Sequence, residues 1–403
     1  MTDVERRLDV LTLNSGSSSL KFGLYRAGSL SLETLVSGEA TLASDKDGTF
    51  HARDARGTTL CTEAIALQNQ AEAIVRIGRL LIDAKMPAPA AIGHRIVHGG
   101  PKLRQHCLID DDVLAKLKAA TAFAPLHMPA ALSVIGSAKE LFPGLPQVAC
   151  FDTTFHAGLP DVARVLPIPK ALQADGIQRY GFHGLSYESI LRQLGQPLLN
   201  RIVIAHLGNG ASVTAVKDSR SIDTSMGLTP SGGVIMGTRG GDLDPGVLLY
   251  LMRERKFDAA MLGDLINHRS GLLGISVVSS DMRALHAAAP ANADARLAID
   301  MFCISVRKMI AAMIAVLDGI DMLVFTGGIG EHDAQVRDAI CSGLSWIGVG
   351  LDAARNRSVT NPISNTASRF PVLVLAAQEN EQIARHSWEL LTPAFTPSPP
   401  AKT

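Results

Sequence analysis

The 403-residue sequence has few aromatic residues, no excess of charge of either sign and no long uncharged apolar run. Aromatic residues make up 4% of the chain, which disfavours a surface that stacks nucleic-acid bases. Its 38 basic and 38 acidic residues give a formal net charge of zero, so nothing indicates a nucleic-acid partner or an anionic membrane surface. No stretch of about 18 apolar residues is free of charged residues, so we expect no membrane span.

Cysteine is scarce and scattered. The five cysteines, at positions 61, 107, 150, 303 and 341, form no Cys-x-x-Cys pair, which predicts buried, reduced thiols rather than disulfides or zinc ligands. The first nine residues are charged and lack the apolar stretch of a signal peptide. We therefore expect a cytoplasmic protein.

The first informative feature that is present is a strand, a tight polar turn and a second strand at residues 10–25. The turn, Asn14-Ser-Gly-Ser-Ser-Ser19, holds small residues whose backbone N–H groups can face an anion. The next strand alternates apolar residues at 20, 22 and 24 with Lys21, Gly23 and Tyr25, which predicts one buried face with Lys21 off it. A similar layout recurs at 201–216, and two such units suggest a nucleotide held between two related domains.

Hydrophobic periodicity predicts the same order of elements in both halves of the chain. In the first half we expect strands at 9–14, 20–26, 31–38, 91–98 and 147–152, and helices at 62–84, 111–119 and 129–140. In the second half we expect strands at 201–207, 211–217, 220–224, 321–326 and 371–375, and helices at 246–254, 258–266, 294–317, 332–344 and 380–391. The chain therefore reads as a duplicated α/β unit.

A chain of 403 residues is too long for one ordinary core, so we expect two domains. They would cover residues 1–152 and 153–383, and the last helix, about 384–391, could pack back on the first domain. The proline-rich tail at 392–403 is expected to be disordered.

Two glycine-rich segments of the second half are candidates for ligand contact. Residues 223–246 hold seven glycines and few large apolar side chains, and such a loop in a compact enzyme is usually functional. Arg239 in this loop can approach a ligand or pair with Asp242 or Asp244. Residues 326–332 follow an apolar strand and open a helix, so they predict either a nucleotide contact through backbone N–H groups or a plain helix-entry turn.

Charged residues near strand ends complete the candidate site. Arg95 lies on a strand expected to be buried, where it needs a ligand anion or an internal ion pair. Asp152 ends a strand, which is where open α/β sheets bind ligands. His183, beside Phe182, is placed to meet a charged group, and such Arg and His residues suit phosphoryl transfer. Any metal would be Mg²⁺, with Glu379 the best-placed carboxylate.

Seven motifs, in order and with compatible spacing, resemble those of the acetate kinases. They are Asn14-Ser-Gly-Ser-Ser-Ser-Leu-Lys21, Gly93-His-Arg-x-Val-His-Gly-Gly100, Phe151-Asp-Thr-x-Phe-His156, Tyr180-Gly-Phe-His-Gly184, His206-Leu-Gly-Asn-Gly-Ala-Ser212, Gly237-Thr-Arg239 with Gly241-Asp-Leu-Asp-Pro245, and Thr326-Gly-Gly-Ile-Gly-Glu331. The resemblance runs from about residue 8 to residue 388.

This resemblance implies the superfamily of acetate and sugar kinases, heat-shock ATPases and actin. Its fold is α/β, with two ribonuclease-H-like domains of βββαβαβα order and a nucleotide cleft between the domains. It implies the reaction ATP + acetate ⇌ ADP + acetyl phosphate, a Mg²⁺ ion with Mn²⁺ as an alternative, and a homodimer.

The resemblance also implies roles for individual residues. Asp152 would be the acid/base residue, whereas His183, Arg239 and His127 would stabilise the phosphoryl group in transfer. Arg95 would hold the acetate or the phosphoryl group, and Val97, Leu126, Phe182 and Pro230 would surround the methyl group. Lys21 would approach a nucleotide phosphate, and Asn14 and Glu379 would organise the metal ion. The remaining nucleotide contacts would come from His206, Leu207, Gly208, Asn209, Gly210, Asp281, Met282, Arg283, Gly328, Ile329, Gly330, Glu331 and His332.

The sequence departs from the family pattern at three positions. Asn380 follows Glu379 where a second acid is usual, so Glu381 stays an alternative metal-side carboxylate. Gly240 stands where Ser or Cys is common, and Met128 stands where Asn is common, which could alter the rim of the pocket.

Two other functions remain open. A propionate or other short-chain acyl kinase would differ only in pocket volume, and one methylene is worth about 1–3 kcal/mol. A nucleotide-gated interaction protein, like actin or a heat-shock ATPase, would not need Arg95, His183 and Arg239 near the γ-phosphate.

Overall fold

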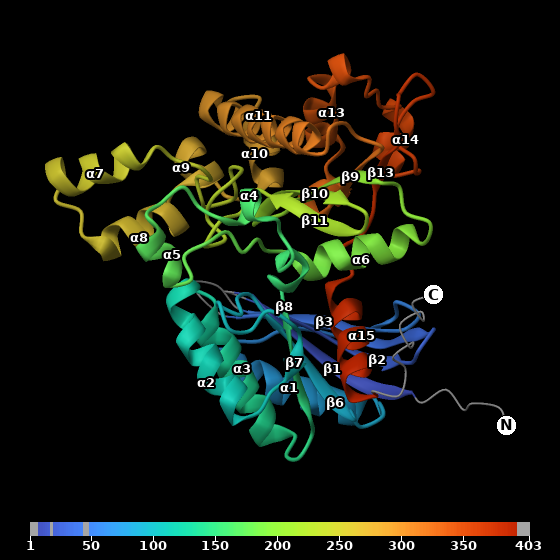
Figure 1. Ribbon diagram of the computed structural model, residues 1–403. Helices are drawn as coiled ribbons and strands as arrows, with labels where there is room; N and C mark the ends of the chain where they lie inside the picture. Colours follow the sequence, from blue (N-terminus) through green and yellow to red (C-terminus); the bar gives the residue numbers. More distant parts are fainter. Residues whose placement is uncertain (1–6, 17–18, 43–47, 393–403) are drawn as a thin grey trace, which may run out of the picture. The chain divides into compact units, whose positions relative to one another are not determined.

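The computed structural model describes residues 7–16, 19–42 and 48–392, which divide into two compact units (Figure 1). Unit 1 comprises residues 1–154 and 378–403, and unit 2 comprises residues 155–377. The unit boundaries therefore fall at 154/155 and 377/378 rather than at the expected 152/153 and 383/384. Ser17 and Ser18 of the polar turn, and the tail from residue 393, lie outside the described residues.

Unit 1 is built on an eight-stranded sheet in the order β5-β4-β3-β2-β1-β6-β8-β7. The strands are β1 (Leu8–Ser15), β2 (Ser19–Ala27), β3 (Leu32–Thr41), β4 (Thr49–Asp54), β5 (Thr59–Ala64), β6 (Ala91–Ile96), β7 (Cys107–Leu108) and β8 (Gln147–Phe151). Strands β1, β2 and β3 pair antiparallel, whereas β6 pairs parallel with β1, and β8 pairs parallel with β6. The carboxyl ends of β1, β6 and β8 consequently meet at one edge of the sheet.

Helices cover both faces of this sheet. On one face α1 (Gln70–Asp83) and α3 (Met128–Leu141) bury the side chains of Leu13 and Phe22. On the other face α15 (Glu379–Leu391) packs on β1, β2 and β6, where Ala384 meets Tyr25. The alternation at 20–25 is therefore confirmed for its apolar residues and for exposed Lys21, but Tyr25 is buried as well because α15 covers the second face. Helix α2 (Asp111–Ala120) packs against α3.

Unit 2 repeats the central part of this sheet. Its five strands are β9 (Arg201–Leu207), β10 (Ala211–Lys217), β11 (Arg220–Thr224), β12 (Met322–Thr326) and β13 (Val372–Val374), in the order β11-β10-β9-β12-β13. As in unit 1, the first three strands pair antiparallel and the last two pair parallel. The order and directions match β3-β2-β1-β6-β8, so the predicted duplication is confirmed.

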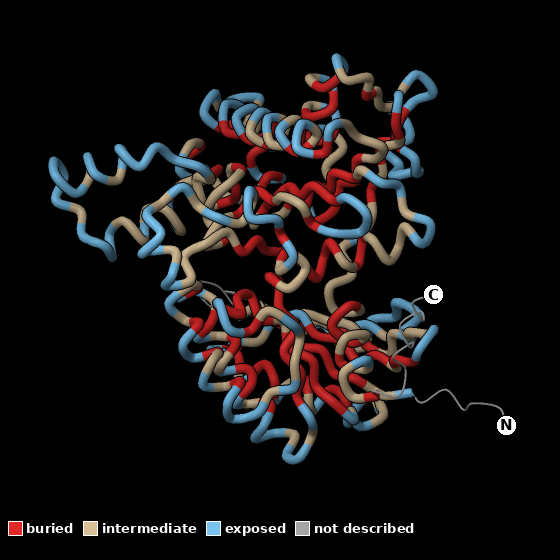
Figure 2. Tube along the Cα trace, in the orientation of Figure 1, coloured by how far each residue is buried: buried red, intermediate tan, exposed pale blue. Residues whose placement is uncertain are grey.

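Some helices of unit 2 cover the two faces of its sheet, and the others lie outside the sheet. Helix α6 (Gly184–Leu194) packs on one face through Tyr187 and Ile190, and α11 (Ala293–Val316) packs on β9, β10 and β11. The other helices are α4 (Asp161–Arg164), α5 (Lys170–Ala174), α7 (Pro245–Glu254), α8 (Ala259–His268), α9 (Gly271–Ser276), α10 (Met282–Ala288), α12 (Gly327–His332), α13 (Ala334–Ser342) and α14 (Ala353–Ser358). In each unit the buried residues concentrate at the sheet and the helix faces that cover it (Figure 2).

Two sequence-based assignments are wrong. The expected helix at 62–84 begins only at residue 70, because Asn69 caps it by accepting the Glu72 N–H at 3.0 Å, while Glu72 accepts the Gln68 N–H at 2.9 Å. Residues 59–64 form β5 instead. The glycine segment expected to be a loop at 327–332 is itself the short helix α12. Within the described residues, no helix is both long enough and apolar enough to cross a membrane.

Candidate active site

Three polar side chains in unit 1 lie at the carboxyl ends of neighbouring parallel strands. Asn14 follows Leu13, which pairs with His94, and Arg95 comes next on β6. Asp152 follows directly after β8, with its N–H bonded to the Ile96 carbonyl. The parallel register therefore brings Asn14, Arg95 and Asp152 together at the sheet edge where α/β folds bind ligands.

Arg95 is the centre of this group. Its Nη2 donates to Asp152 Oδ2 at 2.6 Å and its Nε to Asp152 Oδ1 at 3.0 Å, while Nη1 donates to Asn14 Oδ1 at 3.2 Å. The side chain of Asp152 has no solvent exposure, and that of Arg95 is 17% exposed. Burial by itself would lower the pKa of Arg95, but the charges of Asp152 and Glu379 and the hydrogen bonds to Asp152 raise it above its ordinary value.

Glu379, the first residue of α15, belongs to the same group. Asn14 Nδ2 donates to Glu379 Oε2 at 2.9 Å, and Arg95 Nη1 lies 4.0 Å from the same oxygen. The charge of Glu381 instead acts on Tyr25, whose pKa burial and this carboxylate raise. The geometry therefore favours Glu379 over Glu381 as the metal-side carboxylate.

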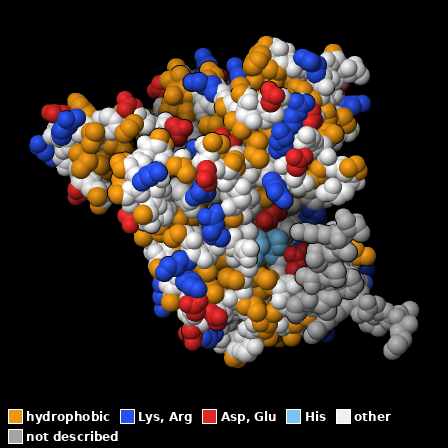
Figure 3. All heavy atoms as spheres, viewed as in Figure 1, with side chains coloured by type: hydrophobic (Ala, Val, Ile, Leu, Met, Phe, Trp, Pro, Cys, Tyr) orange, Lys and Arg blue, Asp and Glu red, His pale blue; other side chains and the backbone are white. Residues whose placement is uncertain are grey.

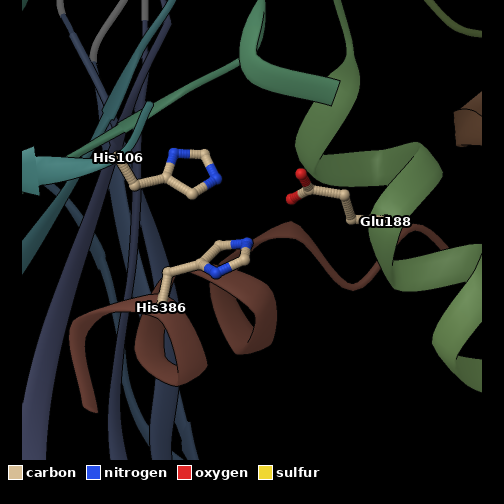
Figure 4. Close-up of side chains that lie close together, drawn as sticks. All are labelled: His106, Glu188 and His386. Atoms are coloured by element: carbon tan, nitrogen blue, oxygen red, sulfur yellow. The ribbon is translucent and has the colours of Figure 1, made fainter. Parts of the chain in front are cut away.

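A histidine that the sequence reading missed supports Asp152. His106 Nδ1 accepts the Phe151 N–H at 3.0 Å, one residue before Asp152. Figure 4 shows its ring beside that of His386 on α15, with ring centroids 4.1 Å apart. Because Nδ1 accepts a hydrogen bond, the neutral His106 ring carries its proton on Nε2, which makes it a donor rather than a metal ligand there. The contact fixes the end of β8.

In unit 2, two basic groups converge on the turn between β9 and β10. A Cβ atom placed on Gly210 would lie 3.3 Å from His183 Nε2 and 3.9 Å from Arg239 Nη1. A Cβ atom on Gly208 would lie 3.9 Å from His206 Nε2 and 3.9 Å from the Gly328 nitrogen. The two glycines therefore leave room in front of these donors that any other residue would fill.

Hydroxyl groups orient the two histidines. His183 Nδ1 bonds to Ser212 Oγ at 2.8 Å, and Ser212 Oγ also bonds to the Tyr187 hydroxyl. His206 Nδ1 bonds to Ser186 Oγ at 2.9 Å, and its ring stacks on His183 with centroids 4.2 Å apart. Burial raises the pKa of Tyr187 to about 12, which keeps its hydroxyl protonated. If Tyr187 donates to Ser212, and Ser212 to His183, then His183 Nε2 keeps its proton and can donate to an anion.

His183 also has an uncommon backbone conformation. Its φ is 60°, in the left-handed region, at the N-cap of α6. Such a conformation in a non-glycine residue typically costs about 1 kcal/mol or more, and it recurs at functional sites. Among these supports only Ser212 is marked by a sequence motif, which begins at His206, whereas no motif marks Tyr187 or Ser186.

Backbone contacts hold Arg239 in its glycine-rich loop. Its Nη1 donates to the Pro230 carbonyl at 2.5 Å, and its own carbonyl accepts the Met236 N–H at 3.0 Å. Asp242 accepts the Gly233 N–H, and Asp244 accepts the Gly246 N–H at the start of α7. Both carboxylates thus have structural roles of their own within the loop.

The short helix α12 begins with a forced glycine. Gly327 has φ 78°, and a Cβ atom there would lie 2.7 Å from the Leu207 carbonyl oxygen. Glu331 Oε1 accepts the N–H groups of Gly327 at 3.0 Å and Ala377 at 2.9 Å. Gly328 is exposed beside the turn at Gly208, so the backbone of α12 borders the same space as the two histidines.

The other predicted residues fall into two groups by accessibility. Lys21, Leu126, Asn209, Arg283, Gly328 and His332 are exposed. Val97, Phe182, Leu207, Pro230, Met282 and Gly330 are buried. Arg283 pairs with Asp281 at 2.6 Å, and His127 stands at the N-cap of α3. Val97, Leu126 and His127 belong to unit 1, whereas Phe182 and Pro230 belong to unit 2.

A separate cavity of about 330 Å³ lies in unit 2, and most of its polar side chains already have partners within the chain. It is lined in part by Arg164, Gln173 and Gln178. Arg164 already donates to Gln178 and to Asp161 at 2.6 Å each, and Gln173 donates to two backbone carbonyls.

Known proteins are similar to this chain along most of its length. The profile of the acetokinase family matches residues 9–385. The acetate kinase of Methylocella silvestris is 42% identical over 397 residues, covering 95% of this chain and 98% of that protein. The acetate kinase of Rhodopseudomonas palustris is 39% identical over 391 residues, covering 94% and 98%.

Solved structures give the same result. A propionate kinase from Francisella tularensis matches with a TM-score of 0.87 and 36% identity, over 95% of this chain and 100% of that chain. The acetate kinase of Porphyromonas gingivalis matches with a TM-score of 0.82 and 34% identity, over 96% and 100%. The predicted fold class, two ribonuclease-H-like α/β domains, is thereby confirmed.

Arg239→Ala should lower the turnover of ATP-dependent phosphoryl transfer by about 10²–10³-fold, because a preorganised donor to the transferring group would be lost. Thermal unfolding should change little, since the loop keeps its backbone hydrogen bonds. Arg296→Ala, which removes an exposed guanidinium on α11, is the matched control and should keep wild-type turnover. Steady-state kinetics measure both variants, and wild-type turnover in Arg239→Ala would rule out this role.

Proposed function

The chain belongs to the acetokinase family, and from this premise we propose that it transfers the γ-phosphoryl group of ATP reversibly to the carboxylate of acetate, giving acetyl phosphate and ADP. One observation carries this proposal: His183 Nε2 and Arg239 Nη1 converge on the open space at Gly210. A phosphoryl group in transfer carries its charge on three equatorial oxygens, and an oriented imidazole N–H and a guanidinium are suitable donors to them.

The nucleotide would bind mainly to backbone groups of unit 2. The turn at Gly208 lies next to His206 Nε2 and the Gly328 nitrogen, so its N–H groups can face phosphate oxygens. We assign the nucleotide contacts to the turn 206–210, to residues 281–283 and to residues 328–332. The exposed side chain of Lys21 in unit 1 would contact a phosphate.

Arg95 would bind the carboxylate of acetate. A guanidinium has five N–H groups, and the contacts with Asp152 and Asn14 use three of them, which leaves two for a ligand. Asp152 would act by orienting Arg95, because acetate is already ionised at neutral pH and has no proton for a base to remove. Val97, Leu126, Phe182 and Pro230 would contact the methyl group.

The residues at the end of β1 fit a Mg²⁺ ion. Asn14 and Glu379 offer amide and carboxylate oxygens, which are the ligands that Mg²⁺ prefers, and Mn²⁺ accepts the same ligands. Asn14 Nδ2 donates to Glu379 Oε2, so the two side chains are in direct contact. A bound ion would supply positive charge to the phosphate oxygens of ATP.

We propose direct in-line transfer. An oxygen of acetate, held by Arg95, would attack the γ-phosphorus while His183 and Arg239 donate to the phosphoryl oxygens, with His127 as a further donor. Positioning and electrostatics suffice for this reaction, so it needs no covalent enzyme intermediate.

Short-chain acids should separate the candidate functions. With ATP and acetate the chain should form an acyl phosphate, trapped as its hydroxamate, and propionate should react with kcat/KM lower by about 10-fold or more. A higher kcat/KM with propionate would favour a propionate kinase. No acyl phosphate with acetate, propionate or butyrate would favour a nucleotide-gated interaction protein.

Glu379→Gln should raise the Mg²⁺ concentration for half-maximal activity by about 10-fold or more, because a ligand or its orienting partner is weakened. Glu381→Gln is the matched control, two residues along the same helix with its charge acting on Tyr25, and should stay near the wild-type value. Magnesium titrations of activity measure both. A larger effect of Glu381→Gln would move the assignment to that residue.

We also propose a homodimer formed through the α7–α8 hairpin of unit 2. Figure 1 shows these helices extending away from the sheet of this unit, and apolar side chains gather on them in Figure 3. The exposed apolar residues are Val247, Leu249, Tyr250, Met252 and Met261, each at least 41% exposed. Exposed apolar patches of this kind mark interaction sites, and a self-complementary patch gives a two-fold dimer.

Sedimentation equilibrium should give the mass of two chains for the wild type. The double substitution Leu249→Lys with Tyr250→Lys should give the mass of one chain, because it places charge in the apolar contact. Leu30→Lys, at a 94% exposed position of unit 1, should leave the dimer intact. A single-chain mass for the wild type at micromolar concentration would contradict the dimer.

A further inference from the structure

A polar contact links two segments of unit 2 that are far apart in the sequence. His286 Nε2 on α10 lies 2.8 Å from Asp333 Oδ2, in the single residue between α12 and α13. Both side chains are partly buried, with 25% and 15% exposure. Helix α10 begins at the proposed nucleotide contacts 281–283, and α12 carries those at 328–332. The contact therefore joins the two segments assigned to the nucleotide.

Asp333 forms hydrogen bonds through its backbone N–H and through both of its carboxylate oxygens. Its N–H donates to the Ile329 carbonyl at 3.0 Å, which closes α12. Its Oδ1 accepts the Gln335 and Val336 N–H groups, at 3.1 and 3.0 Å, and so caps α13. Only Oδ2 reaches outside this segment, to His286. A carboxylate oxygen can only accept, so His286 Nε2 carries the proton in this contact.

The last turn of α12 is held firmly from its other side. Arg337 is 1% exposed, and its Nη1 donates to the carbonyls of Gly330 at 2.9 Å and Glu331 at 3.0 Å. Its Nε and Nη2 donate to Asn356 at 2.8 and 2.6 Å. The junction at Asp333 is thus a fixed point, and the His286 side chain on α10 bonds directly to it.

The start of α10 is held by its own cap and by apolar packing. Asp281 caps the helix by accepting the Arg283 N–H at 2.8 Å, and the Arg283 side chain, 92% exposed, pairs back on Asp281. Met282 and Leu285 anchor the helix in the core. Helix α10 also packs on α11, and α11 packs on α13. Apolar packing of this kind is not directional, whereas the hydrogen bond from His286 to Asp333 is, so this bond restricts the spacing of residues 281–283 and 328–332 most closely.

We propose that His286 is a positioning residue for the nucleotide: through Asp333 it fixes the spacing of residues 281–283 and 328–332, and thereby sets the affinity for adenine nucleotides without touching them. This inference rests on the proposed function. A misplaced pair of binding segments weakens ground-state and transition-state binding equally, which raises the KM for ATP and leaves kcat unchanged.

The test compares two substitutions at one position. His286→Leu removes the donor and keeps the bulk, whereas His286→Gln retains an N–H near the position of Nε2. His286→Leu should raise the KM for ATP and the dissociation constant for ADP by about 10-fold or more, as expected for one hydrogen bond to a charged group. The kcat and the KM for acetate should stay within about twofold. His286→Gln should recover most of the lost affinity.

Hydrogen exchange gives an independent readout. The amides of 327–333 should exchange faster in His286→Leu than in wild type, and return toward wild type in His286→Gln. His51→Leu, which removes an imidazole on β4 of unit 1, is the control and should change neither nucleotide affinity nor this exchange.

Two outcomes would overturn the inference. One is wild-type affinity for ADP in His286→Leu. The other is a loss of kcat, acetate affinity and thermal stability together, unrelieved by glutamine, which would indicate a general structural role. Failure of the proposed function has a different signature, since ADP affinity is measured without acetate: the wild type would bind ADP and form no acyl phosphate.

Discussion

The ion pair between Arg95 and Asp152 organises the polar end of unit 1. Asp152 is fully buried, and a buried carboxylate without a partner is strongly destabilising, so its charge requires the guanidinium that β6 brings to it. Arg95 in turn holds Asn14 and lies close to Glu379. One guanidinium therefore ties three parallel strands and the start of α15. Because this structure uses only part of its hydrogen-bonding capacity, the same group can bind a small carboxylate.

Unit 2 has a sheet with the same strand order and directions, but its polar residues serve a different purpose. Its turn after β9 and the start of α12 are built from glycines, which leaves open space in front of His183, His206 and Arg239. Hydroxyl groups and backbone carbonyls hold these side chains in place before any ligand arrives. Such preorganisation is the main way in which proteins accelerate reactions that develop charge, because little reorganisation is needed as the reaction proceeds. In the proposed reaction the work is thus divided between oriented donors in unit 2 and the Arg95 guanidinium in unit 1.

Local patterns in the sequence predicted the strands of unit 2 and the central strands of unit 1 well, but they missed β4, β5 and β7. The strands at 201–207, 211–217 and 220–224 were predicted to the residue, because each alternates or runs apolar between clear turns. The helix predicted at 62–84 starts too early, because the apolar content of β5 resembles that of a helical turn. Only the N-cap at Asn69 marks where α1 begins. The segment 327–332 was expected to be a loop, since three glycines disfavour a helix, yet Glu331 stabilises one by bonding Gly327.

The site shows the same limit of sequence patterns. Arg95, Asp152 and His183 could be identified because a charged or polar residue on a buried strand or in a glycine-rich loop needs an explanation. Most of their supports could not, because Tyr187 and His106 are ordinary residues whose role depends on contacts across the fold. The sequence could not decide between Glu379 and Glu381 as the metal-side carboxylate. The structure distinguishes them, because Glu379 bonds to Asn14 whereas the charge of Glu381 acts on Tyr25.

The central claim is that oriented donors transfer the phosphoryl group directly from ATP to a carboxylate. The stereochemical course at phosphorus tests it most directly, using ATP whose γ-phosphoryl group is made chiral by oxygen isotopes, with acetate as acceptor. One in-line displacement predicts inversion of configuration in the acyl phosphate. Retention would contradict the account, because it requires two displacements and hence a phosphorylated enzyme intermediate.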